Sequence, residues 1–300
     1  MNASSASSPE LIEAHRAVLG DGLEIRRALP ARQRRTIGAW CFLDHAGPVP
    51  LRTGDEIHVG PHPHIGLQTF TWMIAGEILH RDSLGSEQRI RPRQVNLMTA
   101  GRGISHSEES IPGSGSTVQL AQLWIALPEA QRHGDPAFEH YAELPQLERD
   151  GFRMTLLAGE SLGERSPVRV HSPLLGLELS AVGAGQTAMP LDSNFEHGLL
   201  VLEGAAEVAG QALRPGTLLY LPPGLEHLEL RCEAAARLLL IGGTPFPERV
   251  LLWWNFVGRT QEELAQATKD WNTGDRFGQV RGFKGPRLEA PDLSGLHLRA

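Results

Sequence analysis

The sequence predicts an all-β fold in which two β-barrels follow one another and a short helix lies near the C-terminus. Glycine and proline account for 33 and 21 of the 300 residues, which is typical of a chain with many turns. Short apolar or alternating runs, ended by Gly, Pro, Asn or Asp, recur along the chain. One arrangement of strand and glycine turn occurs twice, which indicates two similar barrels.

The individual elements follow from these runs and from one helical pattern. Thr260 and Glu263 have the spacing of a helix-capping box, and Leu264, Ala267 and Trp271 recur at helical intervals. We therefore expect a helix at residues 260–271. The clearest strands are expected at residues 67–74, 119–126, 154–157, 174–179, 198–202, 217–221 and 237–241.

The internal repeat joins a strand that ends at Gly76 with a strand that ends at Gly204. Each strand is followed by a hairpin-like stretch and by a second glycine turn, at Gly101 and Gly224, that precedes a histidine. The offsets between equivalent glycines are 128 and 123 residues. The two halves therefore share an order of strands and turns, although few of their residues are identical. The expected organisation is a disordered or extended tail at 1–19, a metal-binding barrel at 20–130, a polar linker at 131–151, a second barrel without metal at 152–285 that includes the helix, and a tail at 286–300.

Composition and charge exclude several classes of protein. The chain has 28 Lys and Arg against 35 Asp and Glu, a formal net charge of −7, which disfavours nucleic acid as a partner. The arginine-rich stretch at residues 26–35 is a local exception that we interpret as a solvated face. No apolar run reaches the roughly 18 residues that span a bilayer, and the N-terminus lacks the pattern of a signal peptide. With two distant cysteines and no disulfide framework, a cytoplasmic location is expected.

Two short histidine motifs suggest a metal site in the first barrel. His62 and His64 are two positions apart, and His106 and Glu108 repeat this spacing 44 residues later. In a strand, residues at i and i+2 point to the same face, so neighbouring strands would aim three imidazoles and one carboxylate at one point. Such a set suits Fe, Mn, Co, Ni, Cu or Zn and is too rich in nitrogen for Ca or Mg.

These motifs resemble those of the pirin family, which belongs to the cupin superfamily. The resemblance covers about residues 20–275, and its most specific part is the segment from Thr99 to Glu108, TAGRGISHSE. It implies two tandem cupin barrels of the jelly-roll type and one non-haem iron per chain in the first barrel. By motif match, the implied iron ligands are His62, His64, His106 and Glu108.

The resemblance also implies a function. Several pirins are quercetin 2,3-dioxygenases, so we expect an iron-dependent oxidoreductase that acts on a flavonol or similar aromatic enol with O2. Glu108 would be the catalytic base that takes the hydroxyl proton. The alternative is an iron-bearing, redox-sensitive regulatory protein with a protein partner, for which residues 26–35 are a candidate contact. A zinc-dependent isomerase or hydrolase is a third reading, and the substrate, the metal and the oligomeric state stay open.

Some positions depart from the family pattern or have an open role. Ile65 and Gln68 stand where the family has an arginine and an acidic residue, which leaves the surroundings of the metal open. In the second barrel, Glu196 and His227 do not make a metal site, and we interpret them as remnants or satisfied interior groups. His80 and Asp82 either line the pocket or simply lie on a strand.

Overall fold

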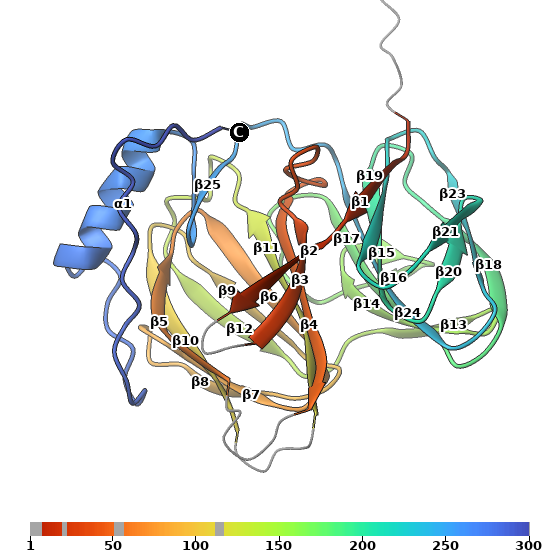
Figure 1. Ribbon diagram of the computed structural model, residues 1–300, viewed down its shortest axis with the longest axis horizontal. Helices are drawn as coiled ribbons and strands as arrows, with labels where there is room; N and C mark the ends of the chain where they lie inside the picture. The colour runs from red at the N-terminus through yellow and green to blue at the C-terminus, as the bar shows by residue number, and fades with distance from the viewer. Residues whose placement is uncertain (1–7, 20–22, 51–56, 112–116, 300) are drawn as a thin grey trace, which may run out of the picture. The chain divides into compact units, whose positions relative to one another are not determined.

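The computed structural model describes residues 8–19, 23–50, 57–111 and 117–299, which its contacts divide into two units (Figure 1). The first, which we call the histidine-rich unit, comprises Arg16–Ile25, Asp44–Ala142 and Pro247–Ala300. The second unit comprises Met1–His15, Arg26–Leu43 and Glu143–Phe246. Residues 1–7 of the expected N-terminal tail lie outside the described residues.

Two antiparallel sheets form the barrel that contains the histidine motifs. The larger sheet has the order β12-β9-β6-β11-β4-β3-β2, and the smaller has the order β5-β10-β7-β8. The bounds are β2 His15–Leu19, β3 Leu23–Leu29, β4 Trp40–Pro50, β5 His58–His64, β6 Leu67–Ala75, β7 Ile78–Asp82, β8 Glu87–Ile90, β9 Val95–Thr99, β10 Ile104–Ser110, β11 Thr117–Ala126 and β12 Ala137–Tyr141.

The second unit repeats this plan, which confirms the two cupin barrels expected from the sequence. Its larger sheet has the order β1-β22-β19-β24-β17-β14-β13, and its smaller sheet has the order β18-β23-β20-β21. The bounds are β1 Glu10–Glu13, β13 Gln146–Arg149, β14 Phe152–Ala158, β17 Leu174–Ala181, β18 Gly185–Pro190, β19 Glu196–Glu203, β20 Ala206–Val208, β21 Gln211–Leu213, β22 Thr217–Leu221, β23 His227–Cys232 and β24 Ala236–Gly243. This unit also has a short ribbon of β15 Glu160–Ser161 with β16 Glu164–Arg165, and the histidine-rich unit has one of β25 Leu251–Trp253 with β26 Phe256–Gly258.

Strands also form where the sequence suggested a tail and a linker. Glu10–Glu13, within the expected tail at 1–19, pairs with β22. In the expected linker at 131–151, β12 pairs with β9 and β13 pairs with β14. All three are edge strands, which pair with one neighbouring strand and leave their other edge open. Their sequences therefore lack a clear apolar pattern.

The C-terminal helix α1, Gln261–Thr273, begins as its capping signal predicts. Thr260 is the N-cap, and its hydroxyl accepts a hydrogen bond from the Glu263 N–H at 3.1 Å. The sequence grouped this helix with the second barrel, but it belongs to the histidine-rich unit. The reason is apolar packing of one helix face, since Leu264, Ala267 and Trp271 are buried with Ile65 and Phe256. No helix within the described residues is long and apolar enough to cross a membrane.

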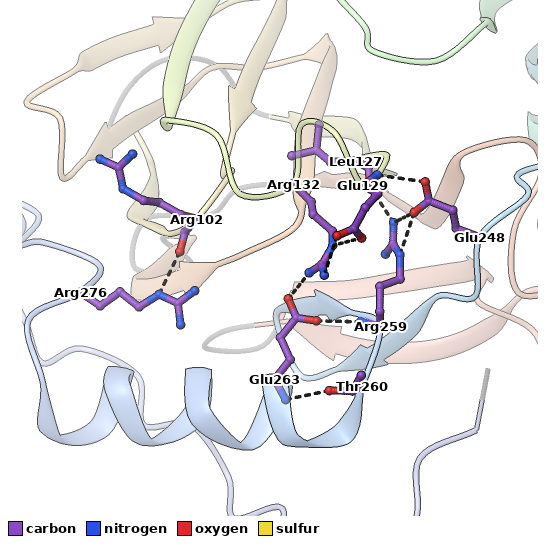
Figure 2. Close-up of polar contacts among 9 residues, drawn as sticks. All are labelled: Arg102, Leu127, Glu129, Arg132, Glu248, Arg259, Thr260, Glu263 and Arg276. Atoms are coloured by element: carbon purple, nitrogen blue, oxygen red, sulfur yellow. Dashed lines mark hydrogen bonds and ion pairs between the residues drawn. The ribbon is translucent and has the colours of Figure 1, made fainter.

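Charged side chains join the start of α1 to the loop that follows β11 (Figure 2). Glu263 pairs with the Arg132 guanidinium and also accepts the Arg259 N–H at 2.9 Å. Arg259 in turn donates from Nε to Glu248 at 2.9 Å and from Nη2 to the Leu127 carbonyl at 2.7 Å. The C-terminal segment therefore belongs to the scaffold of the barrel that holds the histidine motifs.

Candidate metal centre

The two histidine motifs lie on adjacent antiparallel strands. His106 of β10 is directly opposite His62 of β5, and Ile104 is opposite His64. Directly opposed residues share a face of the sheet, so the three imidazoles project to one side. The turn before β10 requires glycine, because Gly101 has φ +51° and a Cβ there would lie 2.2 Å from the Gly134 carbonyl oxygen.

The three histidine side chains form a buried cluster, in which ligand atoms of all three lie within 4.8 Å of one another. The Nε2 atoms of His64 and His106 are 3.0 Å apart. Two nitrogens about 2.1 Å from one ion are about 3.0 Å apart when their bonds meet at a right angle. The nitrogen separation is therefore short enough for both atoms to bind one transition metal ion.

Hydrogen bonds leave the Nε2 atoms of His62 and His64 free for a metal. His62 Nδ1 donates to the Gly60 carbonyl and His64 Nδ1 to the Asn255 carbonyl, each at 2.9 Å. Because a carbonyl only accepts, both rings carry their proton on Nδ1 when neutral. Burial lowers the pKa of His62 to about 4 and holds the pKa values of His64 and His106 well below the ordinary value. Neutral imidazole is the form that binds metal.

Glu108 belongs to a second, overlapping group. Its carboxylate lies within 4.8 Å of ligand atoms of His80 and His106, so His106 is common to both groups. In the pairing of β10 with β5, the register shifts between His106 and Glu108, as at a β-bulge. Burial raises the pKa of Glu108. The four expected ligands thus lie in two overlapping groups that share His106.

His80 and Asp82 are the residues whose place the sequence left open, and both are buried beside the cluster. His80 Nδ1 is 3.3 Å from His106 Nδ1, and His80 Nε2 is 3.3 Å from Asp82 Oδ2. In the ladder between β7 and β10, Asp82 is opposite His106 and His80 is opposite Glu108. The available signal was their i, i+2 spacing, which is the spacing of the two other motifs.

The two departures from the family pattern lie away from the imidazole cluster. The His64 ring contacts Trp124 edge to face, and Trp124 is opposite Thr69, so Thr69 is on the cluster side of β6. Its neighbour Gln68 therefore faces the other side, where its amide donates to the Thr99 hydroxyl at 2.9 Å. Ile65 is buried in the apolar cluster under α1.

Within the described residues of the second unit, no group of His, Cys, Asp and Glu resembles a metal site. Glu196 is a satisfied interior group, as its carboxylate accepts the Gly38 N–H at 2.6 Å and the Tyr220 hydroxyl at 2.9 Å. His227 is exposed, which corrects the interior position considered for it. His197 is fully buried, and neither ring nitrogen has a hydrogen-bond partner.

Comparison with known proteins places this fold and cluster in context. The family model described as Pirin matches residues 22–125, and the Pirin C-terminal cupin domain matches residues 176–278. A Pseudomonas aeruginosa protein provisionally named a quercetin 2,3-dioxygenase is 52% identical over 94% of this chain and 90% of its own length. A pirin-like protein of Caulobacter vibrioides is 37% identical over 94% of this chain and 95% of its own.

Solved structures show the same likeness. The crystal structure of a quercetin 2,3-dioxygenase from Acinetobacter baumannii is 51% identical, covers 97% of both chains and has a TM-score of 0.93. The Escherichia coli pirin YhhW, crystallised in complex with nickel(II), is 18% identical, with a TM-score of 0.61 over 79% of this chain and 99% of its own. The latter likeness concerns the fold alone.

Proposed function

Because this chain belongs to the pirin family, we propose that it is an iron-dependent dioxygenase of quercetin-like flavonols. The observation that carries the proposal is the buried cluster of His62, His64 and His106, with Glu108 adjoining it. The names of two relatives about half identical to this chain support the choice of substrate class.

The residues present suit such a metal in type and in protonation state. His62, His64 and His106 would hold the iron through nitrogen, with Glu108 as a carboxylate ligand. When bound, the iron supplies Lewis acidity toward the enol hydroxyl and redox chemistry with dioxygen. Imidazole nitrogen with one carboxylate is a donor set for several first-row metals, so Mn, Co, Ni and Cu belong in the same experiment.

The protein side chains would supply the remaining parts of the reaction. Glu108, buried and next to His106, accepts the hydroxyl proton of the substrate, because a carboxylate acts as ligand and as base. The cluster residues are buried, which limits water around a reactive intermediate. Trp124, against the His64 ring, offers an aromatic surface beside the metal ligands.

The test is oxygen uptake by the iron-reconstituted protein with quercetin, alongside the His64→Ala variant. We expect uptake with the wild type, together with loss of both iron binding and turnover in the variant. His227→Ala is the matched control, since His227 is an exposed histidine of the second unit. Turnover that persists in metal-free protein contradicts the proposal.

Absence of uptake with iron bound would favour the alternative of a redox-sensitive regulatory protein. Arginines of the candidate partner contact at residues 26–35 already make contacts within the second unit. Arg34 pairs with Glu10 at 2.8 Å and lies 3.7 Å over the Tyr220 ring, and Arg27 lies 4.4 Å over Phe42. These contacts leave less of the stretch at residues 26–35 for a partner.

A further inference from the structure

His106 differs from the other two histidines of the cluster in what its Nδ1 atom meets. His62 and His64 each face a backbone carbonyl, which only accepts and therefore fixes the ring proton on Nδ1. His106 Nδ1 instead faces His80 Nδ1 at 3.3 Å. Because a neutral imidazole has one donor and one acceptor nitrogen, this contact alone does not fix which nitrogen of His106 is bare.

Asp82 settles the direction of these hydrogen bonds. Its Oδ1 accepts the N–H groups of Leu84 and Ser86, each at 2.9 Å, and its Oδ2 faces His80 Nε2. Burial raises the pKa of Asp82, but hydrogen bonds from His80 and Ser86 outweigh it and the pKa lies below the ordinary value. An ionised carboxylate only accepts, so a neutral His80 ring has its proton on Nε2. Its bare Nδ1 then accepts from His106 Nδ1, and His106 Nε2 is left without a proton.

The surroundings also hold these hydrogen-bonded side chains, Asp82, His80 and His106, in one geometry. The cross-strand register places His80 diagonally from His106 and directly opposite Glu108. The Phe138 ring of β12 stacks on His80, with centroids 4.4 Å apart and an angle of 15° between the planes. His80 and Asp82 are 2% and 1% exposed, so water does not compete for their hydrogen bonds.

We propose that Asp82 and His80 are positioning residues of the metal centre, which fix the ring orientation and tautomer of His106 so that its Nε2 faces the metal. The proposal rests on the proposed function only in taking His106 as a ligand. It assigns Asp82 and His80 no contact with substrate. Its competitor is His80 as a direct ligand, since His80 also groups with His106 and Glu108.

The substitution Asp82→Asn tests the direction of the hydrogen bonds from His106 through His80 to residue 82. The amide oxygen keeps the place that accepts the Leu84 and Ser86 N–H groups, so the NH2 group faces His80 Nε2. That nitrogen must now accept, which moves the His80 proton to Nδ1 and puts a donor against His106 Nδ1. Presenting His106 Nε2 to a metal would then place two donors in contact. We expect Co(II) to bind 10–100-fold more weakly, in the range of other outer-partner substitutions.

A pair of substitutions at His80 separates positioning from ligation. His80→Asn retains an acceptor near the place of Nδ1, whereas His80→Leu has none. We expect His80→Asn to bind Co(II) more tightly than His80→Leu, with Co(II) visible spectra of wild-type form in both Asp82→Asn and His80→Asn. Glu196→Gln is the matched control, because it changes a buried carboxylate of the second unit and should leave the affinity unchanged.

The titrations use Co(II) alone against a competing chelator, with far-UV circular dichroism of each metal-free variant as a check of folding. Affinities within twofold of wild type for both Asp82→Asn and His80→Leu would overturn the proposal. A spectrum that shows one nitrogen ligand fewer in both His80 variants would overturn it in favour of His80 as a ligand. If the proposed metal site itself is wrong, the result differs: His64→Ala then binds Co(II) with the same affinity as the wild type.

Discussion

The buried histidines of this chain differ in the protonation that their surroundings allow. In the cluster, burial keeps the rings neutral, and carbonyl groups and a neighbouring imidazole accept hydrogen bonds from Nδ1 and leave Nε2 for a metal. Burial also lowers the pKa of His197 in the second unit, to about 4, but there neither ring nitrogen has a hydrogen-bond partner. One residue type therefore serves as a candidate ligand in one unit and as an uncharged core residue in the other.

His197 makes the stability of the second unit depend on pH. Its pKa is about 4 in the folded chain and about 6.5 in an unfolded chain, so the unfolded state binds more protons between these values. Stability contributed by the neutral ring is present above pH 6.5 and is lost as pH falls toward 4. From pH 7 to pH 5 the free energy of unfolding should fall by about 2 kcal/mol through this residue.

Urea titrations of wild type and His197→Leu at the two pH values measure this contribution. The variant removes the titrating group and two unpartnered polar atoms, so its free energy of unfolding should fall less than that of wild type. His227→Leu, at an exposed position, is the control and should follow the wild type. Parallel falls in wild type and His197→Leu would rule out this role for His197.

The first turn of α1 illustrates how one side chain holds an element to its barrel. Glu263 bonds the Arg259 N–H and pairs with Arg132, whose side chain is only 11% exposed (Figure 2). Its neighbour Glu262 is exposed and lies in the same first turn. At either position, a negative charge stabilises the helix through its interaction with the helix dipole.

Glu263→Ala should therefore destabilise the protein by about 1–3 kcal/mol, because it leaves a partly buried arginine without one of its partners. Glu262→Ala, which removes an equal charge from the same turn, should cost only a few tenths of a kcal/mol. The measurement is the free energy of unfolding of both variants at one pH. Equal losses would mean that Glu263 acts only through its charge on the helix dipole.

The elements that the sequence predicted are those whose signal is local. The central strands and the N-cap at Thr260 follow from alternation and from a capping pattern within a few residues. The edge strands β1, β12 and β13 carry polar residues on an open side and gave no such signal. The assignment of α1 to the histidine-rich unit also depends on a contact with Ile65, far away in the chain.

The candidate site shows the same limit. His62, His64, His106 and Glu108 stand in two local i, i+2 motifs, so the residue spacing was enough to select them. The place of His80 beside His106 depends on the register between β7 and β10, which is set by pairing over 26 residues of sequence. The register shift between His106 and Glu108 likewise belongs to the β5–β10 ladder, which joins strands far apart in the sequence.

The two units use one sheet plan for different interiors. Strands β5, β10 and β7 carry the histidines and Asp82, whereas the corresponding β18, β23 and β20 contribute Met189, Leu228, Leu230 and Val208 to an apolar core. Apolar burial stabilises the second unit without a ligand. The histidine-rich unit instead contains buried imidazoles whose Nε2 atoms face one another, an arrangement that a cation between them would stabilise.

Metal binding should therefore protect only one of the two barrels against opening. A ligand at 100 times its Kd stabilises the state that binds it by about 2.7 kcal/mol, equivalent to about 100-fold slower exchange of amides that open only when the metal leaves. Hydrogen exchange measured by mass spectrometry, with chelated protein and with Co(II), should show this slowing in β5 and β10. Peptides from β18 and β23 should exchange at the same rate in both conditions. In His64→Ala the metal should have no effect on either set, and equal slowing of both sets in the wild type would contradict a site confined to the histidine-rich unit.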